Sequence, residues 1–130
     1  MEKKGENWEL HHMCIVVKDL AKAVKYYQSL GIVTTMKPEF ENKDLKLRFV
    51  YVNETPYEFV QPLTKESSFQ KFLDENGEGL NHLCFFVDDL AKEKAKLIKK
   101  GVKFLGGSET QMSFDTREQG NVILELKQIE

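Results

Sequence analysis

The sequence of 130 residues lacks several features that would define its class at once. It has only two cysteines, which excludes a disulfide-rich secreted scaffold. No apolar run approaches the roughly 20 residues that a membrane-spanning helix needs. Basic residues are not in excess, since 19 Lys and Arg stand against 21 Asp and Glu, and no basic face for nucleic acid is visible. We therefore expect neither a membrane nor a nucleic-acid partner.

The length suits one domain, which we expect to span residues 1–130 and to bury about two-thirds of its unfolded surface. Residues 1–7 are polar and lack the apolar core of a signal peptide, and we expect them to be frayed. Two cysteines without such a signal predict a reduced, cytoplasmic protein.

The most informative feature that is present is an internal repeat. Aligning His12 with His82, an offset of 70 residues, superimposes identical residues in both copies without a gap. Repeats of this kind predict two structural modules built on one plan. Within residues 12–31, the identical pairs are His12/His82, Cys14/Cys84, Val17/Val87, Asp19/Asp89, Leu20/Leu90, Ala21/Ala91, Lys22/Lys92 and Gly31/Gly101.

Both copies read as β-α-β-β-β, in module 8–61 and module 80–128, joined by a connection over 62–79. Alternating apolar residues predict strands at 8–17, 32–36, 45–52, 57–61, 80–87, 102–105, 110–116 and 122–127. Asp19 and Asp89 are placed as N-caps of helices that end before Gly31 and Gly101, and 67–76 predicts a short connecting helix. The sequence therefore predicts an α+β fold in which two paired βαβββ modules form a curled mixed sheet around a metal cleft.

Finer expectations concern individual side chains. The helical stripe Leu20, Val24, Tyr27 and Leu30 should face the sheet. Residues 38–44 should be a polar loop, and Gly106-Gly107 a turn. In strand 45–52 we expect the face with Leu45, Leu47, Phe49 and Tyr51 to be covered by the helix, so that Arg48 points into the cleft.

Two histidines and two glutamates form the candidate functional site. Each module places a histidine on its first strand, His12 or His82, and a glutamate on its last, Glu58 or Glu125. Alternation puts all four opposite the helix-covered face. Two imidazoles and two carboxylates form a mixed N/O donor set for a divalent metal of the Zn, Ni, Co, Mn or Fe type, with positions left open for substrate.

Other interpretations compete with these. A single His or Glu on a half-exposed strand is usually a polar surface residue, and only its recurrence at matched positions favours a metal site. Arg48 either clamps an anionic substrate group or is a solvated strand arginine. Gln111 and Ser113 either contact substrate or are a plain polar lining.

The chain resembles the vicinal oxygen chelate superfamily, which includes glyoxalase I, extradiol dioxygenases and the fosfomycin and bleomycin resistance proteins. Within it, the sequence is most similar to the methylmalonyl-CoA epimerase family. The segments that carry the resemblance are 12–20, 57–63, 67–73, 77–89 and 122–126.

This resemblance implies that His12, Glu58, His82 and Glu125 bind one divalent ion, of the Co, Zn, Ni or Mn class, in a homodimer. It implies a small-molecule carbonyl substrate such as an acyl-CoA, and an enolate-like intermediate. Glu125 would be both ligand and base, and Glu58 its partner on the opposite side. The implied enzyme is an isomerase or epimerase, or a lyase of the lactoylglutathione lyase type.

One segment departs from the epimerase pattern. Residues 107–117 match it clearly only at Phe114, and no glutamate occurs at the third-strand position where Lys46, Leu47 and Arg48 stand. This departure motivates an alternative function, a small-molecule binding or resistance protein with the same fold.

Overall fold

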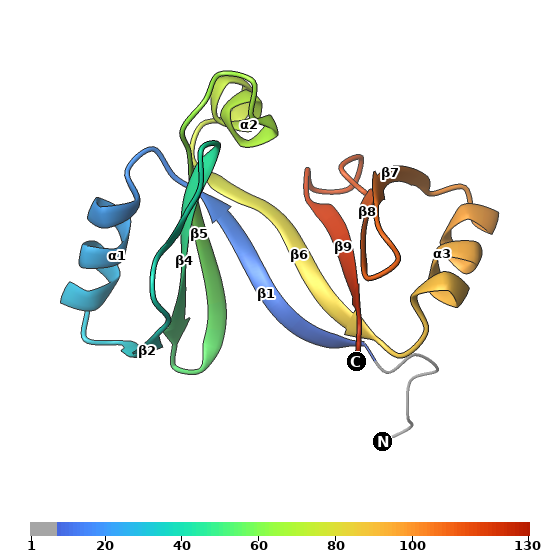
Figure 1. Cartoon of the computed structure of the whole chain (residues 1–130), viewed down its shortest axis with the longest axis horizontal. Helices are drawn as coiled ribbons and strands as arrows, with labels where there is room; N and C mark the ends of the chain where they lie inside the picture. Colours follow the sequence, from blue (N-terminus) through green and yellow to red (C-terminus); the bar gives the residue numbers. More distant parts are fainter. Residues whose placement is uncertain (1–7) are drawn as a thin grey trace. The chain divides into compact units, whose positions relative to one another are not determined.

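The structure, a computed structural model, describes residues 8–130. The expectation about residues 1–7 lies outside the described part. The chain divides into two compact units, whose elements are labelled in Figure 1. One consists of residues 12–81, and the other of residues 82–130 together with 8–11. The predicted connection at 62–79 thus belongs to the 12–81 unit. In residues 8–130, no helix has both the length and the apolar character needed to span a bilayer.

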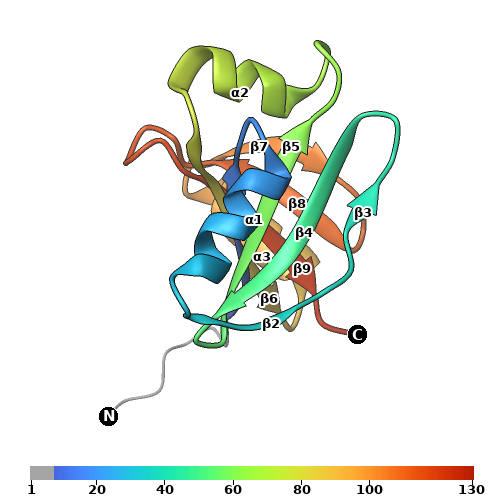
Figure 2. The ribbon, with the colours of Figure 1, turned by 90° about the vertical axis from the view of Figure 1, so that its left-hand side faces the viewer.

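The 12–81 unit follows the predicted plan. Its strands pair in the order β2-β4-β5-β1, with β3 beside β4. The β1/β5 pair is parallel and the other pairs are antiparallel, so the sheet is mixed. Helix α1 lies across β4 and β5, as Figure 2 shows, and α2 packs against β5. The elements are β1 (Glu9–Val16, in this unit from His12), α1 (Leu20–Ser29), β2 (Val33–Met36), β3 (Phe40–Glu41), β4 (Leu45–Val52), β5 (Thr55–Pro62) and α2 (Ser68–Asn76).

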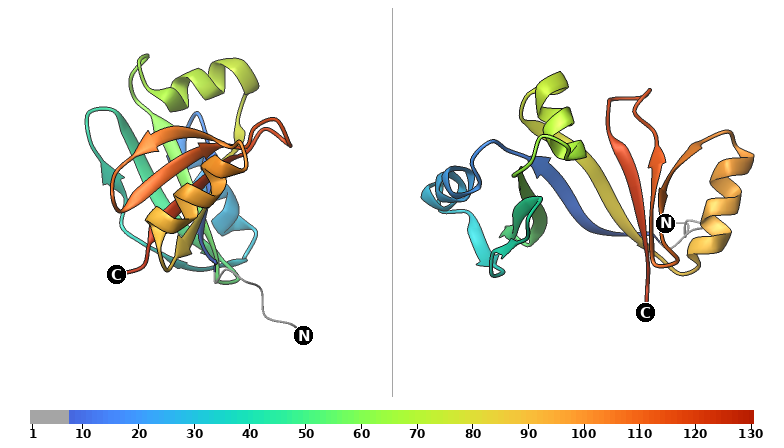
Figure 3. Two further views of the ribbon diagram at one scale, coloured as in Figure 1. Left: turned by 90° about the vertical axis from the view of Figure 1, so that its right-hand side faces the viewer. Right: turned by 45° about the horizontal axis from the view of Figure 1, so that its top comes forward.

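The 82–130 unit repeats this arrangement. Its strands pair in the order β6-β9-β8-β7, with β6/β9 parallel and the remaining pairs antiparallel. Helix α3 packs against β7 and β9, on the side that faces the viewer in the left panel of Figure 3. The elements are β6 (Gly79–Val87, in this unit from His82), α3 (Leu90–Lys99), β7 (Lys103–Gly107), β8 (Gln111–Asp115) and β9 (Ile123–Gln128). The predicted α+β class and mixed strand pairing are confirmed.

The two repeated helices begin where the sequence predicts, and for the predicted reason. The Asp19 carboxylate accepts a hydrogen bond from the Lys22 backbone N–H at 3.0 Å. The Asp89 carboxylate does the same for Lys92 at 3.1 Å. An aspartate at the N-cap satisfies a backbone donor that has no partner within the helix. Gly31 just after α1 has φ +73°, the left-handed conformation that ends a helix most cheaply when the residue is glycine.

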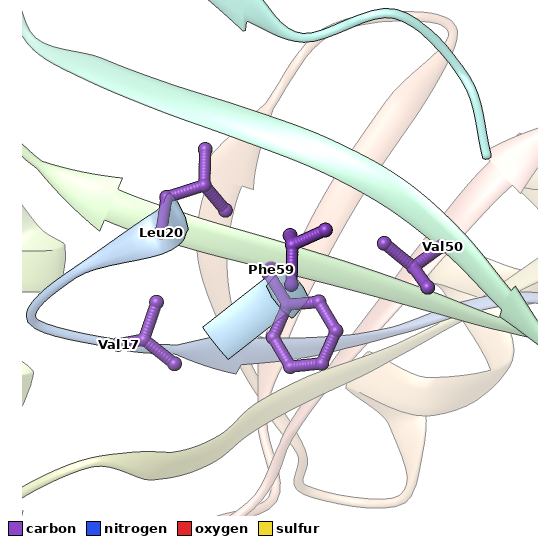
Figure 4. Packing of buried hydrophobic residues seen from close by; sticks show 5 residues of the cluster. Val17, Leu20, Val50 and Phe59 are labelled. Atoms are coloured by element: carbon purple, nitrogen blue, oxygen red, sulfur yellow. The ribbon is translucent and has the colours of Figure 1, made fainter. Parts of the chain in front are cut away.

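The core between α1 and its sheet is built from the face opposite Glu58. Val17, Leu20, Val24, Val50 and Phe59 are buried together there, and Figure 4 shows Val17, Leu20 and Val50 around Phe59. Burial of each side chain contributes about 1.5–3 kcal/mol. The equivalent core against α3 contains Val87, Leu90, Phe114 and Leu126.

The other face of the 12–81 sheet is also covered, which the sequence analysis did not foresee. Cys14, Val16 and Val60 are buried there against Leu73 of α2. Leu45 and Leu47 pack on the same cluster. The prediction that α1 covers the face bearing Leu45 and Leu47 is therefore wrong, because α2 covers it.

Three smaller expectations are also wrong. Leu30 is 49% exposed and is the C-cap residue just after the last residue of α1. Residues 38–44 contain the short strand β3, paired to β4. Gly106 and Gly107 belong to β7 rather than to a turn, and the chain reverses over 108–110. Gly107 has φ +142°, and an added Cβ would collide with the Gln111 backbone carbonyl. Only glycine therefore fits this reversal.

Candidate active site

The first His–Glu pair lies within the 12–81 unit. His12 Nε2 is 3.2 Å from Glu58 Oε1, and the two side chains are only 6% and 13% exposed. Parallel pairing of β1 and β5 produces this proximity, because Cys14 stands in register with Glu58. The His12 ring also meets Phe49 of β4 edge-on, with centroids 5.5 Å apart. Backbone register and ring packing together fix the direction of the imidazole.

The second pair has the same construction in the 82–130 unit. His82 Nε2 is 3.5 Å from Glu125 Oε1, with side chains 8% and 13% exposed. Here Cys84 stands in register with Glu125 across the parallel β6/β9 pair. The repeat therefore preserves residue types, strand register, burial and the N–O separation.

Each pair has the geometry of two donors on one ion. Imidazole nitrogen and carboxylate oxygen lie about 2.0–2.2 Å from zinc, so two such donors at tetrahedral or octahedral angles are about 2.9–3.5 Å apart. The measured separations of 3.2 and 3.5 Å fall within this range. They also suit a direct His–Glu hydrogen bond. The residues present thus fit a divalent metal. Each His–Glu pair can also form a hydrogen bond when no metal is bound.

The surroundings of the two carboxylates differ. Glu125 accepts a hydrogen bond from the Gln111 side-chain amide at 2.6 Å and one from the Ser113 hydroxyl at 3.5 Å. Ser113 is its direct cross-strand neighbour, whereas the cross-strand neighbour of Glu58 is Phe49. Gln111 and Ser113, predicted to bind substrate, therefore lie beside the Glu125 carboxylate, and whether they also touch substrate stays a prediction.

Arg48 is placed differently from the expectation. It pairs across the strands with Phe59, and directly paired residues share a face of the sheet. Because Phe59 lies in the α1 core, Arg48 is on the α1 side rather than on the side of Glu58. Its guanidinium Nε donates to the Lys37 carbonyl at 2.8 Å. The predicted orientation toward the His–Glu face is wrong.

Two glutamines were missed by the sequence analysis. The Gln61 side-chain oxygen accepts from the Leu20 backbone N–H at 2.8 Å, and Gln128 does the same for Leu90 at 2.8 Å. Each stands three residues after a predicted carboxylate ligand, Glu58 or Glu125. The signal was available in the sequence, because both glutamines share the offset of 67 that relates the two glutamates. They tie the last strand of each module to the start of its helix.

The segment 107–117 contains one well-defined charge pair. Arg117 donates from Nε and Nη2 to the two Asp115 oxygens, both at 2.9 Å. These hydrogen bonds from Arg117 hold the pKa of the Asp115 carboxyl far below its usual range. Asp115 stands two residues beyond Ser113 on the same strand, β8. Its charge is therefore already compensated, so we do not assign it to the metal.

Comparison with known proteins is consistent with this geometry. The Glyoxalase/Bleomycin resistance/Dioxygenase superfamily model matches residues 11–117. The chain is 29% identical to human mitochondrial methylmalonyl-CoA epimerase over 136 residues, covering 95% of this chain and 77% of that protein. It is 32% identical to glyoxalase I of Saccharomyces cerevisiae over 117 residues, which cover 73% of this chain but only 36% of the yeast protein.

Among solved structures, methylmalonyl-CoA epimerase from Mycobacterium tuberculosis superimposes with a TM-score of 0.77 at 24% identity. The alignment covers 94% of this chain and 88% of that one. At this identity the similarity establishes the fold. The human and yeast relatives are both enzymes by name, and the prediction of an enzyme is confirmed. The chain belongs to the glyoxalase/bleomycin resistance/dioxygenase superfamily.

Proposed function

We propose that the chain is a metal-dependent epimerase that acts at a carbon next to a carbonyl. One divalent ion of the Co, Zn, Ni or Mn class would take the pairs His12–Glu58 and His82–Glu125, supplied by one chain or by two copies in a homodimer. The observation that carries this proposal is the buried His–Glu pair present in each unit at 3.2 and 3.5 Å. Two N and two O donors leave positions for substrate oxygen atoms.

When bound, the metal supplies Lewis-acid polarisation of a carbonyl oxygen, which lowers the cost of enolate-like charge. Glu125 then removes or returns the proton on the neighbouring carbon. Gln111 and Ser113 hold its carboxylate through both oxygens, and both can also border the substrate. Glu58 serves the opposite side of that carbon, so a proton removed on one side can be replaced on the other.

An acyl-CoA thioester with an acidic α-hydrogen is the substrate class we infer. The human relative and the M. tuberculosis structure are both named methylmalonyl-CoA epimerases. Removal of the α-proton of a thioester is the step that the Glu58 and Glu125 carboxylates are suited to carry out. We place the protein in the cytoplasm, where the buried thiols of Cys14 and Cys84 would stay reduced.

The test combines elemental analysis with solvent exchange. Purified protein should contain about one divalent ion per chain, or one per complete site. In deuterium oxide it should introduce deuterium at the α-carbon of methylmalonyl-CoA and interconvert the two epimers. Both activities should vanish after chelation and return with added metal. Full turnover by chelated protein would refute the proposal.

A second candidate function follows from residues 107–117, which depart from the epimerase pattern. In this alternative the chain binds a small molecule, with the ligand held at the same donors and released unchanged. Saturable binding of an acyl-CoA without deuterium incorporation would favour this function. A glyoxalase-like lyase is distinguished by formation of lactoylglutathione from methylglyoxal and glutathione.

A further inference from the structure

The 12–81 unit contains a cavity of about 530 Å³ between α1 and the end of β1. Its walls are mainly aromatic and aliphatic: Ile15, Val17, Tyr26, Tyr27 and Phe59. Phe59 and Glu58 are successive residues of β5, so their side chains point to opposite faces of the sheet. The cavity is therefore separate from the His12–Glu58 pair. Its volume lies within the roughly 300–1,000 Å³ of small-molecule sites.

The internal repeat indicates what such a cavity can hold. With the offset of 70 residues, Ile15 corresponds to Phe85, Ala23 to Glu93 and Tyr27 to Leu97. In the 82–130 unit, the indole of Trp8 occupies this position. Its ring lies 5.7 Å from the Phe85 ring, and its Nε1 donates to the Glu93 carboxylate at 3.3 Å.

The residue that corresponds to Trp8 in the other unit is Glu78. Glu78 places no ring in the cavity. Its carboxylate instead accepts a hydrogen bond from the Lys18 backbone N–H at 2.8 Å at the rim. At the position of Glu93 stands Ala23, which takes up far less space. One unit thus fills the space beside its helix with its own indole, while the other leaves it open.

The rim of the cavity favours an anionic substituent on the ring. Lys18 and Lys22 both border it. The two neighbouring carboxylates, Asp19 and Glu78, each accept a backbone N–H group. Among residues 8–130, neither carboxylate forms an ion pair with Lys18 or Lys22, so both ammonium groups can contact a ligand. Burial raises the pKa of Tyr27, so its phenol stays a neutral O–H donor.

We propose that this cavity is a binding site for a small, planar aromatic acid. The ring takes the place that Trp8 occupies in the other unit, packed between Ile15 and Tyr27. Lys18 and Lys22 hold the acidic group. Offset or edge-on contacts with Tyr27 and Phe59 orient the ring.

The experiment is calorimetric titration of the full chain with indole-3-acetate, and with indole as the uncharged reference. Indole-3-acetate should bind at one site per chain. Ala23→Phe, which fills the cavity from α1, should weaken binding by at least about tenfold, a loss of about 1.4 kcal/mol. Ala21→Phe is the matched control, because Ala21 is exposed on the same helix and does not line the cavity. It should leave the affinity unchanged.

A second pair of variants tests the rim without altering the core. Lys22→Gln should weaken indole-3-acetate and leave indole unaffected, whereas Lys25→Gln, on the exposed side of α1, should change neither. Circular dichroism confirms that each variant is folded. Absence of saturable indole-3-acetate binding would overturn the proposal. Equal binding by folded Ala23→Phe, or binding that disappears when metal is chelated, would overturn it as well.

Discussion

The two units hold the same His–Glu pair in different surroundings. In the 12–81 unit, Glu58 faces Phe49 across the strands, and the same phenylalanine packs edge-on against His12. In the 82–130 unit, Glu125 faces Ser113 and is hydrogen-bonded by Gln111. Strand register and donor atoms are equivalent. The difference teaches that the repeat keeps the atoms suited to bind metal, while the neighbours that set the reactivity of each carboxylate have diverged.

The largest expected effect separates the two carboxylates. Glu125→Gln should lower exchange of the epimer whose α-proton Glu125 removes by about 10²–10⁴-fold, the usual contribution of a general base. Glu58→Gln should abolish interconversion of the epimers but retain exchange of that same epimer, because Glu125 still serves its own side. Chiral analysis of deuterated product distinguishes the two outcomes. Identical loss of exchange for both epimers in both variants would show that the carboxylates do not act on separate sides.

The next largest effect concerns the Trp8 indole, which packs in the core of the 82–130 unit and has no equivalent ring in the other unit. Trp8→Ala should lower the free energy of unfolding by about 2–3 kcal/mol, somewhat less than for a fully buried tryptophan, and it removes the hydrogen bond to buried Glu93. Glu78→Ala, at the corresponding position, should cost only about 0.5–1 kcal/mol for its exposed hydrogen bond. Urea unfolding of both variants measures the difference. Equal costs would contradict the proposed role of Trp8 as a core ring.

A smaller effect is expected from the positioning residue Gln111. Gln111→Ala should reduce metal affinity or kcat by about 10–100-fold, the range for partners that orient a metal ligand. KM should change little, and Gln111→Asn should recover part of the loss. The control is Phe49→Leu, which changes the neighbour of Glu58 without removing a hydrogen bond. If Gln111→Ala raises KM alone, Gln111 contacts substrate rather than orienting Glu125.

The smallest effect should be equal in both units. Asp19→Ala and Asp89→Ala each remove one N-cap hydrogen bond and should each cost about 1 kcal/mol. Thermal unfolding of the two variants provides the measurement. Asp88→Ala serves as a control, because Asp88 is exposed just before the cap and should leave stability nearly unchanged. If one variant loses more than twice the stability that the other loses, the two N-caps are not equivalent.

Helix starts, most strands and the facing of the His and Glu side chains were predictable from the sequence because local signals determine them. Asp19 caps its own helix, and alternation in β5 correctly separates Phe59 from Glu58. The facing of β4 was not predictable in this way. Both of its faces meet apolar partners, with Val50 against α1 and Leu47 against the cluster that α2 covers. Alternation alone gives no preference when both faces of a strand are covered.

The error at Arg48 has the same origin, since its direction follows from the facing of β4. The surroundings of Glu125 were only partly visible. Alternation placed Gln111 and Ser113 on its face, but their hydrogen bonds depend on the β8/β9 register. That register belongs to the turn over 116–122 that joins β8 to β9, where the Thr116 hydroxyl donates to the Val122 carbonyl at 2.6 Å.

The side chains of Gln61 and Gln128 fix the position of a strand relative to the helix beside it. Each fixes how far along its strand a carboxylate stands relative to the first turn of the neighbouring helix. A slip of one residue would break this bond and turn the carboxylate to the wrong face of the sheet. An engineer who transplants either helix should transplant its glutamine as well.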